Sequence, residues 1–107
     1  MYNCSMKLIY TTLNNVEEAR KIGRGLLEKK LANCVNIFPI TCIYNYENEI
    51  TEEAEVVLII KTIEGKYKEI EPVIKSHITY DNFIGELNVD KINSNFEGWL
   101  CGIVKPS

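Results

Sequence analysis

One histidine and four cysteines are the side chains of this sequence best suited to hold a transition metal. They are His77 and the widely spaced Cys4, Cys34, Cys42 and Cys101, none of which forms a CxxC pair. Copper and zinc bind several nitrogen or sulfur donors held in one geometry. His77 is the candidate ligand for copper or another divalent metal, although a surface or capping role is more common for a lone histidine.

The spacing of the cysteines also bears on their oxidation state. Cys34 and Cys42 are expected in one extended strand, where a rise of about 3.3 Å per residue separates them by ~26 Å. At that distance they cannot form a disulfide with each other. We therefore expect all the cysteines to be free, reduced thiols in a reducing compartment, where they serve as small buried hydrophobic side chains.

A second group of candidates consists of aromatic and charged side chains that would line a cleft between copies of the chain. Such a cleft could bind a small anion or a metabolite. The candidates are Tyr44, Tyr46, Lys61, Tyr80, Asp81 and Trp99. The alternative is simple interface packing, because Tyr and Trp are enriched at interfaces.

Catalysis is not expected from this sequence. It has a single histidine, no GxSxG motif and no glycine-rich phosphate-binding loop. These features argue against a serine or cysteine hydrolase and against a nucleotide-dependent enzyme. We predict no catalytic residue and no enzymatic activity.

Charge and hydropathy exclude further classes of partner. The 107 residues carry 12 basic and 15 acidic side chains, a formal charge of −3. Nucleic-acid binders need clustered Lys and Arg, so nucleic acid is not an expected partner. The longest apolar stretch, 56–60, is far shorter than the roughly 20 residues of a membrane helix, and residues 1–15 lack a signal-peptide core. We expect one domain over residues 1–107, with 1–5 as an N-terminal extension, in a soluble, cytoplasmic protein.

Hydrophobic periodicity predicts the elements that must position these side chains. Strands are expected at 6–13, 31–46, 51–63 and 83–92, and helices at 16–30, 65–76 and 94–103. Pro39 should bulge or interrupt its strand, and Pro72 should kink or divide its helix. The order β-α-β-β-α-β-α predicts an α+β, ferredoxin-like sandwich in which two helices cover one face of an antiparallel sheet.

Helix starts and helix packing also have local signals. Asn15 followed by Glu18 has the spacing of a capping box, and a second box is predicted at 94–97. Gly23 and Gly25 are poor helix formers, which predicts close packing of that helix face on a sheet.

The strand at 51–63 is apolar on both faces, which a monomer of this fold does not explain. Its alternate residues are Val57 and Ile59 on one face and Val56, Leu58 and Ile60 on the other. The strand at 31–46 is likewise apolar on both faces. It would also reach ~50 Å, whereas a globule of about 100 residues is ~34 Å across. The helices cover one face only, and no residues remain for the other. We therefore expect an obligate homo-oligomer joined by strand addition and burial of the open face.

Several segments resemble the CutA (divalent-cation tolerance) family. They are LANCVNI at 31–37, the positions Ile43, Tyr44, Tyr46 and Ile50, EVVLIIKT at 55–62, and Trp99-Leu100. The resemblance extends from about Met6 to Ile103. It implies a ferredoxin-like subunit, a homotrimer that shares strands between subunits, and a role in tolerance of divalent metals such as copper. The alternative function is a trimeric small-molecule sensor that binds a metabolite between chains.

The chain departs from the family pattern before the last strand. The family has an H-P-Y-E motif where this chain has HITYD at 77–81. Either His77 matches the motif histidine, or Tyr80-Asp81 match the Tyr-Glu and Ile78 replaces the histidine. In the second alignment His77 matches another histidine that some members carry beside the motif. A cysteine proposed as a metal ligand in some members falls near Tyr10, whose phenol does not replace a thiolate.

Overall fold

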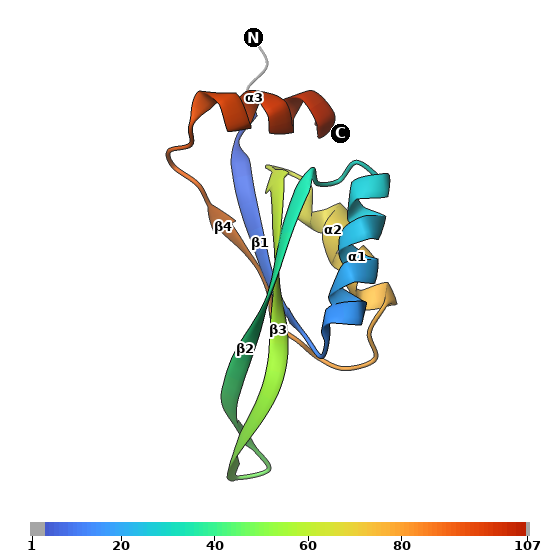
Figure 1. Cartoon of the computed structure of the whole chain (residues 1–107), viewed down its shortest axis with the longest axis vertical. Helices are drawn as coiled ribbons and strands as arrows, with labels where there is room; N and C mark the ends of the chain where they lie inside the picture. The colour runs from blue at the N-terminus through green and yellow to red at the C-terminus, as the bar shows by residue number, and fades with distance from the viewer. Residues whose placement is uncertain (1–3, 107) are drawn as a thin grey trace.

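A computed structural model of the chain describes residues 4–106, so the predicted extension at 1–5 lies mostly outside the described residues. The elements are β1 (Met6–Leu13), α1 (Val16–Glu28), β2 (Cys34–Tyr46), β3 (Glu49–Ile63), α2 (Tyr67–Ser76), β4 (Ile84–Asn88) and α3 (Ser94–Ile103). The strands form one antiparallel sheet in the order β2-β3-β1-β4 (Figure 1). This arrangement confirms the predicted α+β, ferredoxin-like fold. Within the described part of the chain, no helix is long and apolar enough to cross a membrane.

The main core lies between the sheet and the pair α1 and α2, which cover the same face. Its fully buried members come from both layers and include Ile9, Leu13, Leu58 and Ile60 from the sheet and Ile22, Leu26, Ile70 and Ile74 from the helices. Each side chain of this size contributes about 1.5–3 kcal/mol when it is removed from water. Pro72 lies inside α2 without dividing it into two helices.

Helix α1 begins and packs largely as its sequence predicts. The Asn15 side chain caps it by accepting a hydrogen bond from the Glu18 amide at 2.9 Å. A Cβ on Gly23 would lie 3.0 Å from a methyl of Val35, so the glycine lets the helix approach β2. The same prediction is wrong for Gly25, where a Cβ would meet nothing within 4 Å.

Strands β2 and β3 form a long hairpin that is closed by a two-residue turn. Glu47 and Asn48 both have positive φ, 48° and 67°, as a type I′ turn requires. Pairing then runs without interruption from Tyr46 opposite Glu49 to the other end of β2. The bulge predicted at Pro39 is therefore wrong; because β2 is an edge strand, proline can be accommodated there without breaking the sheet.

The hairpin extends well beyond the helices, as its length predicts. The molecule measures 53 × 26 × 20 Å, and the hairpin forms one end of its long axis (Figure 1). Large apolar side chains are exposed along this projecting part, including Ile43, Tyr46 and Ile50, the last of them 80% exposed. The exposed apolar hairpin is the kind of surface that a second chain normally covers.

Helix α3 lies on the sheet face opposite α1 and α2, at the end of the molecule away from the hairpin turn (Figure 1). Its Leu100 packs with Met6 and Ile63, which are paired across β1 and β3. The expectation that no residues remain to cover the second face is thus wrong at this end, because α3 covers it there. The capping box predicted at 94–97 is also wrong: Asn93 is the N-cap, and no side chain caps the helix.

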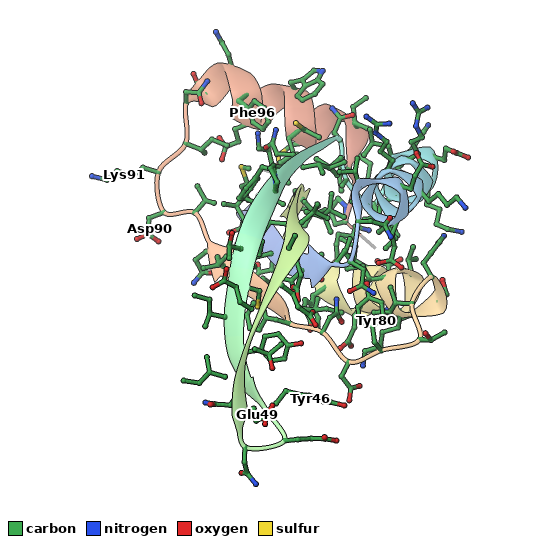
Figure 2. The ribbon with its side chains drawn as sticks, turned by 60° about the horizontal axis from the view of Figure 1, so that its bottom comes forward. Tyr46, Glu49, Tyr80, Asp90, Lys91 and Phe96 are labelled. Atoms are coloured by element: carbon green, nitrogen blue, oxygen red, sulfur yellow. A yellow bond between two sulfur atoms is a disulfide. The ribbon has the colours of Figure 1, made fainter. Side chains whose placement is uncertain are left out.

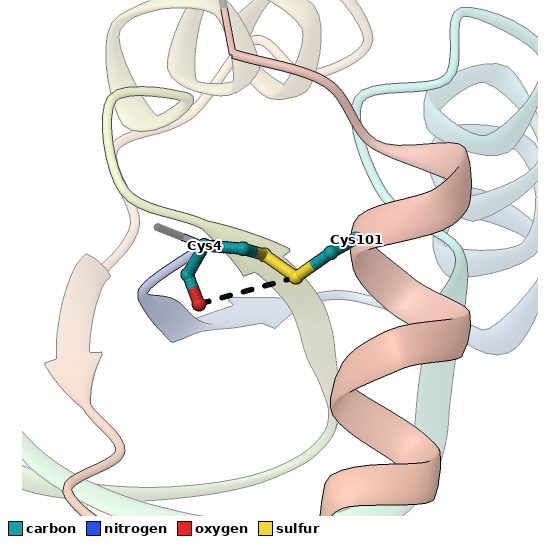
Figure 3. The surroundings of a disulfide bond; sticks show 2 residues. All are labelled: Cys4 and Cys101. Carbon is teal, nitrogen blue, oxygen red and sulfur yellow. Dashed lines mark hydrogen bonds between the residues drawn. A yellow bond between two sulfur atoms is a disulfide. The ribbon is translucent and has the colours of Figure 1, made fainter. Parts of the chain in front are cut away.

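A disulfide joins Cys4 to Cys101 and corrects the expectation that all thiols are free (Figure 3). The two residues are 97 positions apart in sequence, but their Cα atoms lie 6.0 Å apart because α3 packs beside the start of β1. This separation suits a disulfide. Cys34 and Cys42 are free, as expected.

Candidate functional site

A hollow of about 680 Å³ lies between the hairpin and the loop that precedes β4. Its walls carry aromatic, acidic and amide side chains together with one thiol. The lining residues are Thr12, Asn14, Cys42, Tyr44, Tyr46, Glu53, Glu55, Tyr80, Asp81, Asn82 and Phe83. A site of this size with a few polar groups is suited to a small molecule rather than to a macromolecule.

Strand alternation explains which hairpin residues reach the hollow. Cys42 pairs with Glu53 across β2 and β3, so both side chains point to the same face of the sheet. Tyr44 and Tyr46 follow at intervals of two and share that face. It is the face opposite the main core, because the alternate residues Val56 and Leu58 belong to the core that α1 and α2 cover.

Burial and neighbouring carboxylates together raise the pKa values of two groups on the hairpin wall. Burial among neighbouring side chains, and then the charges of Glu55 and Glu53, raise the pKa of the Cys42 thiol. The hydrogen bond of Tyr44 to Glu53 raises the pKa of its phenol, and desolvation adds to this effect. Both groups therefore stay protonated at neutral pH. A protonated Cys42 is a weak metal ligand and a weak nucleophile.

The opposite wall is anchored by Tyr80, which connects two loops that are distant in sequence. Its hydroxyl donates a hydrogen bond to the Glu18 carboxylate and accepts one from the Asn14 amide at 3.1 Å. Burial, and then the bond to Glu18, raise the pKa of Tyr80. Next to it, the Asn82 side-chain amide donates one hydrogen bond to the Thr11 hydroxyl and one to the Thr12 carbonyl, each at 2.9 Å.

The structure divides the predicted ligand residues between two ends of the molecule. Tyr44, Tyr46, Tyr80 and Asp81 line the hollow. Lys61 instead places its ammonium 5.3 Å from the ring centre of Phe96. Trp99 lies on α3, also in contact with Phe96. Figure 2 shows Tyr46 at the hairpin end and Phe96 at the opposite end.

Comparisons with known proteins agree with this fold. A sequence model of the CutA1 divalent ion tolerance protein family matches residues 7–102. The chain belongs to this family. A CutA relative from Thermococcus kodakarensis is 37% identical over 98 residues, 91% of this chain and 94% of the relative. One from Archaeoglobus fulgidus is 43% identical over 93 residues, covering 86% and 91%.

Solved CutA structures superpose on the whole fold. CutA of A. fulgidus, described as a periplasmic divalent cation tolerance protein, has a TM-score of 0.89 and 35% identity over 94% of this chain and 99% of that chain. CutA1 of Ehrlichia chaffeensis has a TM-score of 0.90 and 30% identity over 98% of this chain and 100% of that chain. The hollow therefore belongs to the part of the fold shared with CutA proteins, whereas Cys4 precedes the matched residues.

The candidate metal ligands named from the sequence do not gather in one place within the described part of the chain. His77 ends α2, with its Nδ1 2.9 Å from the Val73 carbonyl and 3.2 Å from the Ser76 hydroxyl. Its side chain borders a smaller hollow beside α1 and is separate from Cys42. Across residues 4–106, no three His, Cys, Asp or Glu side chains lie close enough to hold a metal ion. The donor set of one chain does not fit a copper or zinc site.

The prediction for this CutA chain named four of the lining residues and missed the other seven. Those missed are Thr12, Asn14, Cys42, Glu53, Glu55, Asn82 and Phe83. A signal exists for the three on the hairpin, because Glu53 and Glu55 have the same parity in their strand as Val57, and the turn then places Glu53 opposite Cys42. The contact between Tyr80 and Glu18 has no such signal, because it joins the loop before β4 to the first turn of α1, which only the finished fold brings together.

Proposed function

We propose that the chain is a non-enzymatic CutA-type divalent-cation tolerance protein that acts as a homotrimer. One observation carries the proposal: the sheet face between α3 and the hairpin turn is apolar but uncovered. On this face Phe38 is 39% exposed and Leu87 is 50% exposed. Phe83, 60% exposed, lies over Gly85 beside them. Exposed apolar side chains grouped in this way are typical of a protein interface.

The two edges of the sheet support a cyclic assembly. β2 and β4 are its edge strands, so among the described residues each has one side without a partner strand. Pairing β2 of one copy with β4 of the next uses two different surfaces, and such a contact forms a ring when the rotation closes. A ring of three copies agrees with the trimer that the family resemblance implies.

Metal binding in this proposal depends on more than one chain. His77 supplies one imidazole per copy, and Cys34 and Cys42 supply two free thiols. The raised pKa of the Cys42 thiol opposes metal binding, because only the thiolate is a good ligand. We therefore expect copper to bind weakly and through thiols.

A small metabolite in the hollow is the second candidate ligand. The hollow is open in one chain and lies on the sheet face that the trimer would cover. Its aromatic side chains would contact an apolar or ring-shaped group. Glu53, Glu55 and Asp81 would favour a cationic or hydrogen-bond-donating partner over an anion.

Native mass spectrometry of untagged protein tests the assembly and retained ligands together. The expected result is a trimer with three times the 12.3 kDa mass of one chain. A dominant monomer would contradict the proposed assembly, and a dimer would contradict the trimer. A retained mass that is removed by a chelator would support the metal, whereas an organic mass would support the metabolite.

Copper titration of His77→Ala tests the role of the histidine. The expected result is weaker binding in His77→Ala and almost complete loss of binding when Cys34 and Cys42 are both replaced by Ser. Unchanged affinity and stoichiometry in His77→Ala would remove His77 from the site. A thermal-shift screen of metals, nucleotides and amino acids tests the metabolite, since a ligand at 100 times its Kd stabilises by about 2.7 kcal/mol.

Location in the cytoplasm stays a prediction. The disulfide between Cys4 and Cys101 favours an oxidising compartment, because cytoplasmic thiols are usually kept reduced. Trapping thiols in intact cells before lysis measures which state is present. A mostly reduced pair would support the cytoplasm, and a permanent disulfide would contradict it.

A further inference from the structure

We propose that the Cys4–Cys101 disulfide is a redox-sensitive clamp that fixes α3 on the open face of the sheet. A dithiol reductant would release the helix while the rest of the fold stays intact. The proposal concerns a covalent bond that the family match leaves out, since Cys4 precedes the matched residues 7–102.

Helix α3 buries little of its own surface. Leu100 is its only buried residue, and Trp99 and Ile103 are 51% and 40% exposed. No side chain caps its first turn. Gly98 and Gly102 lie inside the helix, and a Cβ on either one would meet nothing within 4 Å. Because no close packing calls for glycine there, these residues only weaken the helix, by up to about 1 kcal/mol each relative to Ala.

The surface beneath α3 is separate from the main core. Cys4, Met6, Ile63, Leu100 and Val104 form a buried cluster of their own. The main core under α1 and α2 shares no residue with that cluster. Release of α3 would therefore open one cooperative unit of the molecule without removing a residue from the main core.

The chemistry of release is a two-electron thiol–disulfide exchange. Cys101 is partly exposed and Cys4 is 8% exposed, so the attacking thiolate reaches the sulfur of Cys101 more readily. The bond between the two protein sulfurs breaks, a mixed disulfide forms, and the Cys4 sulfur leaves as a thiolate that takes up a proton. The second thiol of the reductant then displaces Cys101, which also becomes a thiol, and the reductant is left as a disulfide.

Release would expose a defined apolar strip. Met6 and Ile63 are buried under α3, and Leu8 packs beside them. Phe96 would lose its contact with the Lys61 ammonium. The strip lies on the same sheet face as the partly buried Tyr10 and Ile59, so reduction would extend the apolar surface at that end.

Hydrogen–deuterium exchange of the full-length protein tests the clamp. In oxidised protein, α3 amides should exchange slowly; after reduction they should exchange at least about ten times faster, while β1 and β3 amides change less than about twofold. Cys4→Ser/Cys101→Ser should match the reduced protein with or without reductant. The matched control, Cys34→Ser/Cys42→Ser, keeps the disulfide and should respond to reductant as the parent does.

Two results would overturn the proposal. The first is that peptide mapping without reductant, after equilibration with oxidised glutathione, finds no peptide that links Cys4 to Cys101. The second is that hydrogen exchange of α3 stays unchanged on reduction, although mapping shows that the bond is broken. Reduction that accelerates exchange throughout β1 and β3 would also contradict a local clamp, because the disulfide would then support the whole fold.

Discussion

The two halves of strand β3 differ in burial and in charge. From Val56 to Ile63 it is largely buried, with Leu58 and Ile60 inside the main core. From Glu49 to Glu55 it belongs to the projecting hairpin and is largely exposed. The chain from residue 31 to residue 60 has five glutamates and no Lys, Arg or His, and all five lie between residues 47 and 55. One strand therefore joins an apolar core to an acidic extension.

The difference indicates a division of tasks between the two regions. The buried half contributes more to the stability of the single chain than the projecting half does, because it removes apolar surface from water. The projecting half contributes little to that stability, yet it supplies Tyr44 and Tyr46 to the candidate hollow. Substitutions in the two halves should therefore separate folding of the chain from its assembly and ligand binding.

The largest expected effect is that of Leu58→Ala. Leu58 is fully buried, so its truncation should lower the free energy of unfolding by about 2–5 kcal/mol. The matched variant Glu52→Ala lies in the same strand and has the same parity as Leu58, but Glu52 is exposed, so its effect should stay within about 0.5 kcal/mol. Denaturant unfolding monitored by circular dichroism measures both. Equal losses would show that the halves of β3 do not differ as proposed.

Much of the difference between these regions could be predicted from the sequence. The alternating pattern of β3 predicts two apolar faces, and the length of the hairpin predicts its overhang. The position of α3 could not be predicted in this way, because a helix of ten residues with only Leu100 buried carries little periodic signal. The pairing of Cys4 with Cys101 depends on that position and was missed for the same reason.

Phe38→Lys should have the next largest effect, and it should act on assembly. Phe38 pairs with Val57 on the uncovered face and is partly exposed, so a single chain can accommodate the lysine. In a trimer that covers this face, an unpaired ammonium would cost about 1–3 kcal/mol per copy in lost burial. Light scattering should show a shift from trimer towards monomer. The control Thr41→Lys, on the opposite face of the projecting hairpin, should leave the mass unchanged.

An unchanged mass for Phe38→Lys would contradict the assignment of this face to the interface. Loss of folded signal in both Phe38→Lys and Thr41→Lys would instead show that β2 supports the single chain more than its exposure indicates. Circular dichroism of each variant distinguishes these results.

Tyr80→Phe should have a smaller effect on the loops that border the hollow. It removes the hydrogen bonds to Glu18 and from the Asn14 amide, which should cost about 1 kcal/mol because solvent reaches the site. The pKa of Tyr80 is raised in the folded state, so its contribution is full below about pH 10 and decreases as the pH rises above the ordinary tyrosine value. The difference in free energy of unfolding between the parent and Tyr80→Phe should thus be constant from pH 7 to pH 9 and should decrease above pH 10.

Unfolding measurements across that pH range check the sign of the effect. The control Tyr46→Phe removes a hydroxyl from the exposed hairpin wall and should change stability little at any pH. If the difference in free energy of unfolding between the parent and Tyr80→Phe instead increases above pH 10, the proposed hydrogen bond to Glu18 is contradicted.

The hollow itself could be predicted only in part. Its aromatic members on β2 follow from strand alternation. Lys61 was grouped with them because its type suits a small-anion site, but its position near the end of β3 places it beside Phe96. Its parity within the strand is the same as that of Glu53 and Glu55, so side-chain direction alone did not separate them. The separation along the strand, about 3.3 Å per residue, decides the outcome.

The smallest expected effect concerns the reactivity of Cys42 in Glu53→Gln/Glu55→Gln. Burial raises the pKa of the Cys42 thiol first, and the two carboxylates raise it further, so removing their charges should lower that pKa and increase the thiolate fraction at pH 7.5. Iodoacetamide should then alkylate Cys42 roughly two to ten times faster, because only the thiolate reacts. Mass spectrometry of tryptic peptides measures the alkylation of Cys42 and Cys34 in the same sample.

Glu52→Gln is the control, because Glu52 lies on the opposite face of β3, so this substitution should leave the alkylation rate unchanged. If Glu52→Gln accelerates alkylation of Cys42 as much as the double variant does, loosening of the hairpin explains the change. An effect confined to Glu53 and Glu55 means that the acidic wall of the hollow controls the thiol.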